Sequence, residues 1–98
     1  MQKRLTSVIH GRVRGVMYRD TTARHAQTLA IKGFVENQTD NTVLVVAEGE
    51  EESLRTLLKY LWLGSPFSSV ERVEEKWSEA TGEFSGFKIR YRNFLDRL

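Results

Sequence analysis

The chain has 98 residues, enough for one domain, and its 40% apolar and 29% charged content is typical of a globular protein rather than a disordered one. It contains no cysteine, which excludes a disulfide framework, a thiolate nucleophile and a zinc finger. The longest apolar run, 43–47, is far too short to cross a bilayer, and the first 20 residues lack the apolar block of a signal peptide. We therefore expect a cytoplasmic protein that does not engage membranes.

The net charge of +2 is unevenly distributed along the chain. Residues 1–35 carry seven Lys and Arg side chains and a single acid, Asp20, whereas residues 36–52 carry six acids and no base. An anionic ligand would be attracted to the first of these segments. The alternative is that these charges are solvated surface.

The first half of the chain predicts a strand, a helix and two further strands. Leu5, Ser7 and Ile9 lie two apart in a run that alternates as a half-buried strand does. Residues 18–31 lack glycine and proline and carry an apolar stripe at helical spacing, namely Thr22, Ala26, Leu29 and Ala30. The remaining elements of this half are a short strand, a turn and a β-branched strand, at 34–38, 39–42 and 43–47.

The second half predicts a helix, a charged strand and a last strand. Gly49 is expected to end the third strand, and the three glutamates that follow it suit the N-terminus of a helix. The buried stripe of this helix is Leu54, Leu57, Leu58 and Leu61. Gly64-Ser65-Pro66 ends the helix, and the two strands that follow are expected at 70–77 and 87–91.

The order β-α-β-β-α-β, with the last strand either continuous or split in two, predicts a ferredoxin-like α+β sandwich. In this fold a mixed, mostly antiparallel sheet is covered on one face by two helices. We expect a single domain over residues 1–98, with its core at about 4–92 and a short C-terminal tail at 93–98.

Topology places the candidate functional residues together. In a β-α-β unit both strands point the same way, so the connection Gly11–Arg19 should lie beside Asn37 and the turn 39–42. Gly11 and Gly15 permit a backbone turn that aims consecutive N–H groups at an anion, and the helix that begins near Tyr18 adds its positive end. Arg19 offers a planar fork of donors that matches phosphate oxygens, and Asn37 offers an uncharged group that can hold a water.

Each of these features also has a purely structural interpretation. The glycine pair can be a tight turn, Arg19 can form a surface salt bridge, and Asn37 can pair within the turn. An arginine is unfavourable at a helix N-terminus, which favours a ligand-binding role for Arg19. His10 and His25 stand apart from any carboxylate cluster, so we interpret them as structural or surface residues rather than metal ligands.

Two segments resemble the signatures of the acylphosphatase family. The run GRVRGVMYR resembles the pattern G-x-V-x-G-V-x-[FY]-R, and GFVENQTDNTVLVVAEG resembles the second signature, in which an asparagine follows a glycine and an aromatic residue. GSPFSSVERV and FKIRY also resemble the segments that follow in that family. The resemblance covers about residues 4–92.

The resemblance implies a small hydrolase that cleaves acyl phosphates to a carboxylate and inorganic phosphate. By position, Arg19 would bind the phosphate and Asn37 would orient the attacking water. The backbone amides that would line the phosphate cradle are those of Arg14, Gly15, Val16, Met17, Tyr18 and Arg19. No metal or organic cofactor is expected, the small-molecule partners are acyl phosphates and inorganic phosphate, and a monomer is the simplest expectation.

Three positions depart from the family pattern. Asn41 stands where glycine is usual, Arg14 where glutamine is common, and Ala30 where a glycine often ends the first helix. Asn tolerates the left-handed backbone that glycine would adopt, so the turn can survive. These departures bear on efficiency more than on reaction type.

Two other functions fit the same fold class. RNA-recognition domains share the fold and the chain has a pI of about 9.2, but the first and third predicted strands carry no aromatic residue for base stacking. A domain that binds a phosphorylated ligand without hydrolysing it is the second alternative, and the presence of both Arg19 and Asn37 argues against it.

Overall fold

Two helices and five strands follow one another along the chain in a computed structural model that describes residues 1–92 and Asp96. The elements are β1 (Gln2–Arg12), α1 (Tyr18–Thr28), β2 (Lys32–Asn37), β3 (Val43–Glu50), α2 (Glu51–Leu63), β4 (Ser69–Glu79) and β5 (Phe87–Arg90). The predicted tail at 93–98 lies outside the described residues, apart from Asp96.

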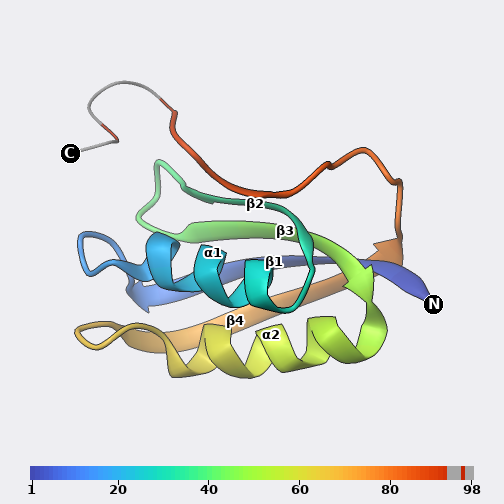
Figure 1. Cartoon of the computed structure of the whole chain (residues 1–98). Helices are drawn as coiled ribbons and strands as arrows, with labels where there is room; N and C mark the ends of the chain where they lie inside the picture. The colour runs from blue at the N-terminus through green and yellow to red at the C-terminus, as the bar shows by residue number, and fades with distance from the viewer. Residues whose placement is uncertain (93–95, 97–98) are drawn as a thin grey trace.

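The five strands form one sheet in the order β4-β1-β3-β2-β5. β1 pairs antiparallel with both β3 and β4, and β2 pairs antiparallel with β3 and parallel with β5. Both helices pack on the same face of the sheet (Figure 1). The ferredoxin-like prediction is therefore confirmed, and the last strand of the pattern is split into β4 and β5 on opposite edges of the sheet.

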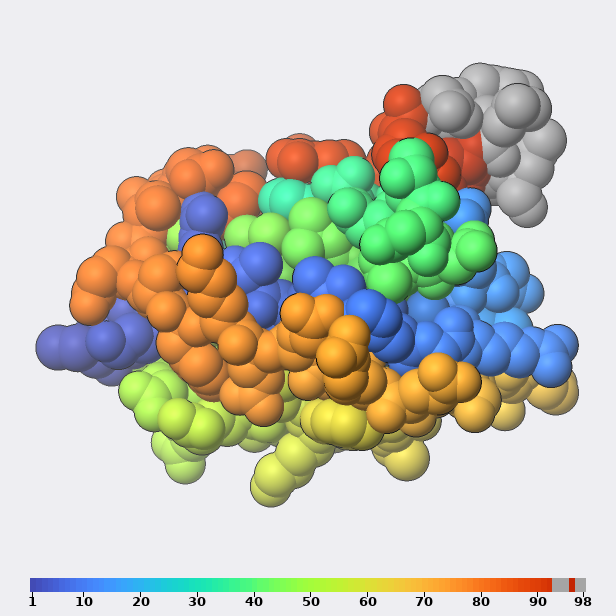
Figure 2. All heavy atoms as spheres, turned by 180° about the vertical axis from the view of Figure 1, so that it is seen from behind, coloured from blue at the N-terminus to red at the C-terminus, as the bar shows by residue number. Residues whose placement is uncertain are grey.

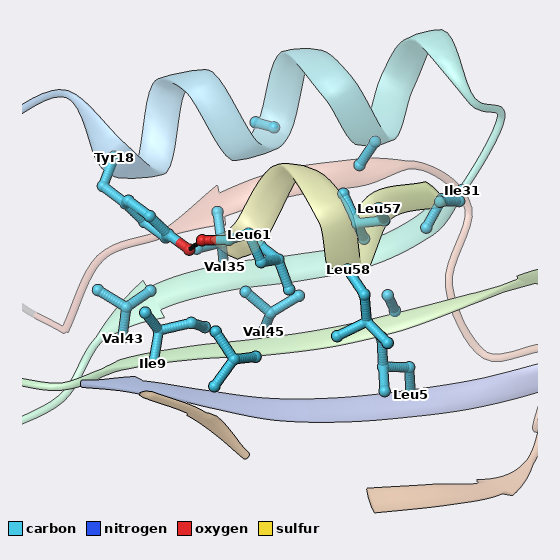
Figure 3. Close-up of a cluster of buried hydrophobic side chains, with 14 of the residues drawn as sticks. Leu5, Ile9, Tyr18, Ile31, Val35, Val43, Val45, Leu57, Leu58 and Leu61 are labelled. Atoms are coloured by element: carbon cyan, nitrogen blue, oxygen red, sulfur yellow. Dashed lines mark hydrogen bonds between the residues drawn. The ribbon is translucent and has the colours of Figure 1, made fainter. Parts of the chain in front are cut away.

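The core lies between the two helices and the sheet (Figure 3). All four leucines of the predicted α2 stripe are buried, namely Leu54, Leu57, Leu58 and Leu61. Leu5, Ser7 and Ile9 of β1 are fully buried on the face that α2 and α1 cover, as their alternation predicts. Burying one such leucine stabilises the fold by about 2 kcal/mol, so this periodic pattern is sufficient to fix which face of each element turns inward.

Helix α1 ends earlier than its apolar spacing predicts. It stops at Thr28, Ala30 adopts a left-handed backbone with φ 58°, and the Ile31 N–H donates to the carbonyl of Ala26. Ala30 is exposed, so its predicted place in the buried stripe is wrong, and Leu29 follows the helix and only partly joins the core. The physical reason is that a left-handed residue closes the helix whatever the spacing of its apolar neighbours.

Strand β3 runs three residues further than predicted, to Glu50. Gly49 does not end the strand but pairs with Lys3 inside it, and α2 begins only at Glu51. A Cβ at Gly49 would lie 3.3 Å from Cγ1 of Ile31, so the glycine here lets β3 approach the segment between α1 and β2 closely and does not break the strand. The last strand, β5, ends at Arg90 and leaves Tyr91 outside.

β1 and β2 run in the same direction and finish at the same end of the sheet, as predicted. The loop after β1 and the β2–β3 turn lie beside one another at this end (Figure 1), and Figure 2 shows residues that follow β5, in red, against the turn, in green. Among the described residues, neither helix combines the length and the apolar character needed to span a bilayer.

Candidate active site

The loop between β1 and α1 is anchored by buried side chains. Val13, Val16 and Tyr18 all belong to the core. The Tyr18 hydroxyl donates to the carbonyl of Leu61 at 2.7 Å, and the Ser65 hydroxyl donates to the carbonyl of Val16. Burial raises the pKa of Tyr18 well above its ordinary value, so its phenol stays protonated as this donor. These contacts fix the path of the loop against the core.

Between these anchors, successive loop residues alternate between positive and negative φ. Gly15 and Met17 have positive φ, 69° and 62°, whereas Val16 and Tyr18 do not. Alternation of this kind turns successive N–H groups toward one concave side, which is the geometry of an anion-binding nest. Met17 is also the N-cap residue of α1 and makes no side-chain capping bond. A left-handed backbone costs a non-glycine residue about 1–2 kcal/mol, so this loop holds a strained conformation next to a helix N-terminus.

Arg19 lies in the first turn of α1, and its side chain is 19% exposed. Its Nη1 lies 3.2 Å from Oδ2 of Asp96, and its Nη2 donates to the backbone carbonyl of the same residue at 3.0 Å. The guanidinium carbon stands 5.0 Å from the centre of the Tyr91 ring. The unfavourable position of a cation at the helix N-terminus is thus offset by an aspartate from the end of the chain.

Asn37 is the last residue of β2 and is buried. Its Nδ2 donates to Oδ1 of Asp96 at 3.2 Å, and its backbone carbonyl accepts from Nε of Arg92 at 2.9 Å. No described residue donates to its side-chain oxygen, Oδ1. An ionised carboxylate can only accept, so it fixes which way the amide faces: nitrogen toward Asp96, and oxygen away from it.

The structure brings the two predicted residues into one cavity. Arg19 and Asn37 line a cavity of about 250 Å³ together with Gly15, Met17 and Tyr18 of the loop. Its remaining wall is formed by Val13, Asp20, Ile89 and Tyr91. The cavity therefore combines a cation, a buried amide and a helix N-terminus with one acid, Asp20, and with apolar and aromatic side chains.

The two departures at the site are bonded to one another. Nη1 of Arg14 donates to Oδ1 of Asn41 at 3.0 Å, and Asn41 has the left-handed backbone, φ 69°, that was expected of it. The pair joins the β1–α1 loop to the β2–β3 turn. The side chain of Arg14 thus faces the turn, while the use of its backbone amide in a phosphate cradle stays a prediction.

Sequence reasoning missed Asp96, which contacts both predicted residues. Its side chain is 1% exposed. Burial acts to raise its pKa, but the N–H of Arg92, the charge of Arg19 and the amide of Asn37 outweigh burial and lower the pKa, so the group is a carboxylate at neutral pH. The available signal was that Asp96 is the single acid in residues 84–98, among four Lys and Arg.

The two histidines lie in surroundings that fit a structural interpretation. His10 contacts Glu74 and Arg72, and His25 stacks on Tyr60 with ring centres 3.7 Å apart. Within residues 1–92 and residue 96, no three His, Asp or Glu side chains are grouped as a metal ion would require.

Fold and site together define a class of protein: a ferredoxin-like α+β domain with a basic loop and a buried amide at one end of its sheet. The sequence profile of the acylphosphatase family matches residues 5–89, so the chain belongs to the acylphosphatase family.

Relatives and solved structures agree with that assignment. The chain is 42% identical over 84 residues to an acylphosphatase of Pelotomaculum thermopropionicum, covering 86% of this chain and 91% of the relative. It is 43% identical over 79 residues to one of Deinococcus radiodurans, covering 81% and 91%. The crystal structure of acylphosphatase from Bacillus subtilis superposes with a TM-score of 0.88 at 30% identity, covering 91% of this chain and 99% of that one. An acylphosphatase from Coxiella burnetii gives 0.84 at 29% identity, covering 91% and 93%.

Proposed function

We propose that this chain is a metal-independent acylphosphatase in which Arg19 and backbone amides of residues 14–19 hold the phosphate and Asn37 orients the attacking water. Membership of the family supports hydrolysis of acyl phosphates. The observation that carries the finer scheme is the single cavity in which Arg19, Asn37 and the N-terminus of α1 converge.

The phosphate end of the substrate fits the basic side of this cavity. A phosphoryl dianion accepts hydrogen bonds from backbone N–H groups at a helix N-terminus and in a nest. A guanidinium adds a charged fork that matches phosphate oxygens. These donors are fixed before the substrate arrives, so they stabilise the charge on the peripheral oxygens in the transition state without further reorganisation.

Asn37 supplies the acceptor that a nucleophilic water needs. Its Oδ1 is buried and accepts nothing from the described residues, so a water that donates to it would satisfy a polar atom that is otherwise costly to bury. The water oxygen forms a bond to phosphorus as the bond from phosphorus to the acyl oxygen breaks, and that electron pair leaves on the carboxylate. One proton of the water passes to a phosphate oxygen of the substrate itself.

The reaction needs no general acid. The leaving group is a carboxylate whose conjugate acid has a pKa of roughly 4, so it departs without being protonated. A series of aroyl phosphates with leaving groups of different acidity checks this point. Because no proton neutralises the charge that develops on the leaving carboxylate, kcat should rise clearly with the acidity of the leaving group. A kcat that hardly changes across the series would indicate protonation of the leaving group and would contradict the scheme.

Two substitutions test the assigned roles with benzoyl phosphate as substrate. Arg19→Ala should remove most turnover, by about 2–4 kcal/mol of transition-state stabilisation or roughly 30- to 1,000-fold, and should weaken competitive inhibition by inorganic phosphate. Asn37→Ala should lower kcat while leaving the phosphate inhibition constant almost unchanged. Arg24→Ala is the matched control, since it removes an exposed arginine from the same helix.

The results also separate the alternatives. If both variants hydrolyse benzoyl phosphate like the parent chain, the roles of Arg19 and Asn37 are wrong. If the parent chain binds phosphate and hydrolyses no acyl phosphate, it is a phospho-ligand domain. Salt-dependent binding to single-stranded RNA would favour the nucleic-acid alternative.

The chain is further proposed to act as a cytoplasmic monomer. Light scattering coupled to gel filtration checks the oligomeric state, and fractionation of cells that express the chain checks the location.

A further inference from the structure

We propose that Asp96 is a positioning residue for the hydrolysis proposed above, because one carboxylate holds both Arg19 and Asn37 in the orientation that the reaction requires. The inference rests on that proposed function. It adds a residue from the end of the chain, outside both signature segments, to the machinery of the site.

The contacts of Asp96 divide between the two partners. Its Oδ2 accepts from Nη1 of Arg19 at 3.2 Å and its Oδ1 accepts from Nδ2 of Asn37 at 3.2 Å. Its backbone carbonyl accepts from Nη2 of Arg19 at 3.0 Å. The carboxylate is itself held by the N–H of Arg92 at 3.1 Å, and the Arg92 side chain donates to the carbonyl of Asn37. Arg92 and Asp96 are thus tied to β2 and α1 by four hydrogen bonds, and the fifth joins them to one another.

Asp96 bonds to both side chains but does not itself line the cavity. The cavity of about 250 Å³ is lined by Arg19 and Asn37, and Asp96 is not among the described residues that line it. A guanidinium has five N–H donors, and the two bonds to Asp96 use two of them. The carboxylate therefore does not take the place that the phosphate needs.

The benefit of such a tether is pre-organisation. Ordering a long side chain such as arginine costs up to about 2 kcal/mol, and the bond to Asp96 meets that cost before substrate binds. The same carboxylate selects the amide orientation of Asn37 that leaves Oδ1 free to accept from water. Its negative charge acts the other way, because it repels a phosphoryl dianion, so the two effects have opposite signs and can be separated.

Three variants separate them: Asp96→Ala, Asp96→Asn and Asp20→Asn. Asp20 is an exposed acid that lines the cavity, so Asp20→Asn removes a comparable charge without removing a bond to Asn37. Each variant is assayed for kcat and KM with benzoyl phosphate, at a temperature where thermal unfolding shows it to be folded. In ¹⁵N-labelled protein, the side-chain signals of Asn37 and Arg19 are recorded with and without inorganic phosphate.

Positioning and charge predict different results. Asp96→Ala should lower kcat about 10- to 100-fold, and Asp96→Asn should fall between it and the parent chain because the amide keeps one acceptor. Asp20→Asn, which removes a charge from the cavity wall, should lower KM. The signals of Asn37 and Arg19 should shift in Asp96→Ala and stay near their parent positions in Asp20→Asn.

Two results would overturn the proposal. If Asp96→Ala raises kcat/KM and tightens phosphate binding, the carboxylate obstructs the site instead of organising it. If the signals of Asn37 and Arg19 do not move in Asp96→Ala, there is no tether. The spectra do not depend on turnover, so they decide the tether even if the parent chain hydrolyses no acyl phosphate, a result that would contradict the proposed function alone.

Discussion

Two buried carboxylates stand at opposite ends of the sheet, Glu48 at one and Asp96 at the other. Each is almost completely shielded from solvent, and each has a lowered pKa. The balance of donors that satisfies them differs. Glu48 accepts from the backbone N–H groups of Thr81 and Gly82, from the Thr81 hydroxyl, and from Arg4 at 2.7 Å. Asp96 accepts from the two side chains that we assign to catalysis and from one backbone N–H, that of Arg92.

The difference shows how one kind of interaction serves two purposes. Glu48 fixes main chain, since its bonds fasten the segment after β4 to β3. Asp96 fixes side chains, since its bonds orient Arg19 and Asn37. Loss of Glu48 should therefore be felt mainly in stability, and loss of Asp96 mainly in turnover.

The largest effect on stability is expected from Glu48→Gln. The new amide would face backbone N–H donors with its own NH₂ group and would leave Arg4 without its buried counter-ion, which should cost about 2–4 kcal/mol. Urea unfolding measures this loss. Glu50→Gln is the matched control: Glu50 is an exposed acid of the same strand, and its removal should change stability by less than about 0.5 kcal/mol.

The same variant tests whether the two ends of the sheet act independently. Folded Glu48→Gln should keep the parent kcat with benzoyl phosphate. A loss of kcat as large as that expected for Asp96→Ala would mean that the two ends of the sheet are not independent.

Acid should destabilise the Glu48 end of the sheet in a defined pH window. Burial acts to raise the Glu48 pKa, but the N–H groups of Thr81 and Gly82 and the Arg4 side chain outweigh it and lower the pKa to about 2. A lowered folded-state pKa gives stability that is present above the unfolded pKa of 4.5 and is lost as pH falls through about 2. The shift sets an upper limit of roughly 3 kcal/mol, and screening near the partly exposed Arg4 should reduce the loss to about 1–2 kcal/mol.

Unfolding midpoints measured from about pH 5 down to about pH 2 check this expectation. The upper limit lies just above the ordinary pKa of 4.5, and the lower limit lies at the lowered pKa of Glu48. The parent chain should lose more stability over that range than Glu48→Gln, which has no group to protonate there. Parallel curves for the two proteins would show that Glu48 is not the group responsible.

The two ends also differ in how far the sequence could predict them. The helix stripe ending at Leu61, the buried face of β1 and the meeting of Arg19 with Asn37 all follow from local periodicity and from the direction of parallel strands. The mispredicted end of α1 has a local cause that spacing does not report, the left-handed backbone of Ala30.

Asp96 could not be placed from the sequence for a different reason. It lies 59 positions from Asn37 and 77 from Arg19, and the residues before it follow no helical or strand period. Its position depends on the path of the chain after β5, which tertiary contacts decide. The hydrogen bond between Arg14 and Asn41 could not be predicted for the same reason. The two residues lie on different loops, and only the fold brings these loops together.

Ser7 differs from both carboxylates, because its buried polar atom has no hydrogen-bond partner among the described residues. It is fully buried in β1, and no described residue bonds to its hydroxyl. Because an unpaired buried hydroxyl costs about 1–3 kcal/mol, Ser7→Ala should raise the free energy of unfolding by about 1 kcal/mol after loss of some packing. Thermal unfolding checks the sign, and a destabilised variant would show that the hydroxyl has a partner.

Asn41→Gly should have the smallest effect, because two terms oppose one another at the site end. Glycine relieves the left-handed strain at φ 69°, worth about 1 kcal/mol, while the variant loses the bond from Arg14, worth about 0.5–1 kcal/mol. Stability should therefore change by less than about 0.5 kcal/mol. Arg14→Gln should cost less in the Asn41→Gly background than in the parent chain, because only in the parent chain does it break that bond, so the two changes should not be additive. A double-mutant cycle on stability and on phosphate inhibition measures the coupling, and a coupling of zero would mean that the two loops are held together by their backbones alone.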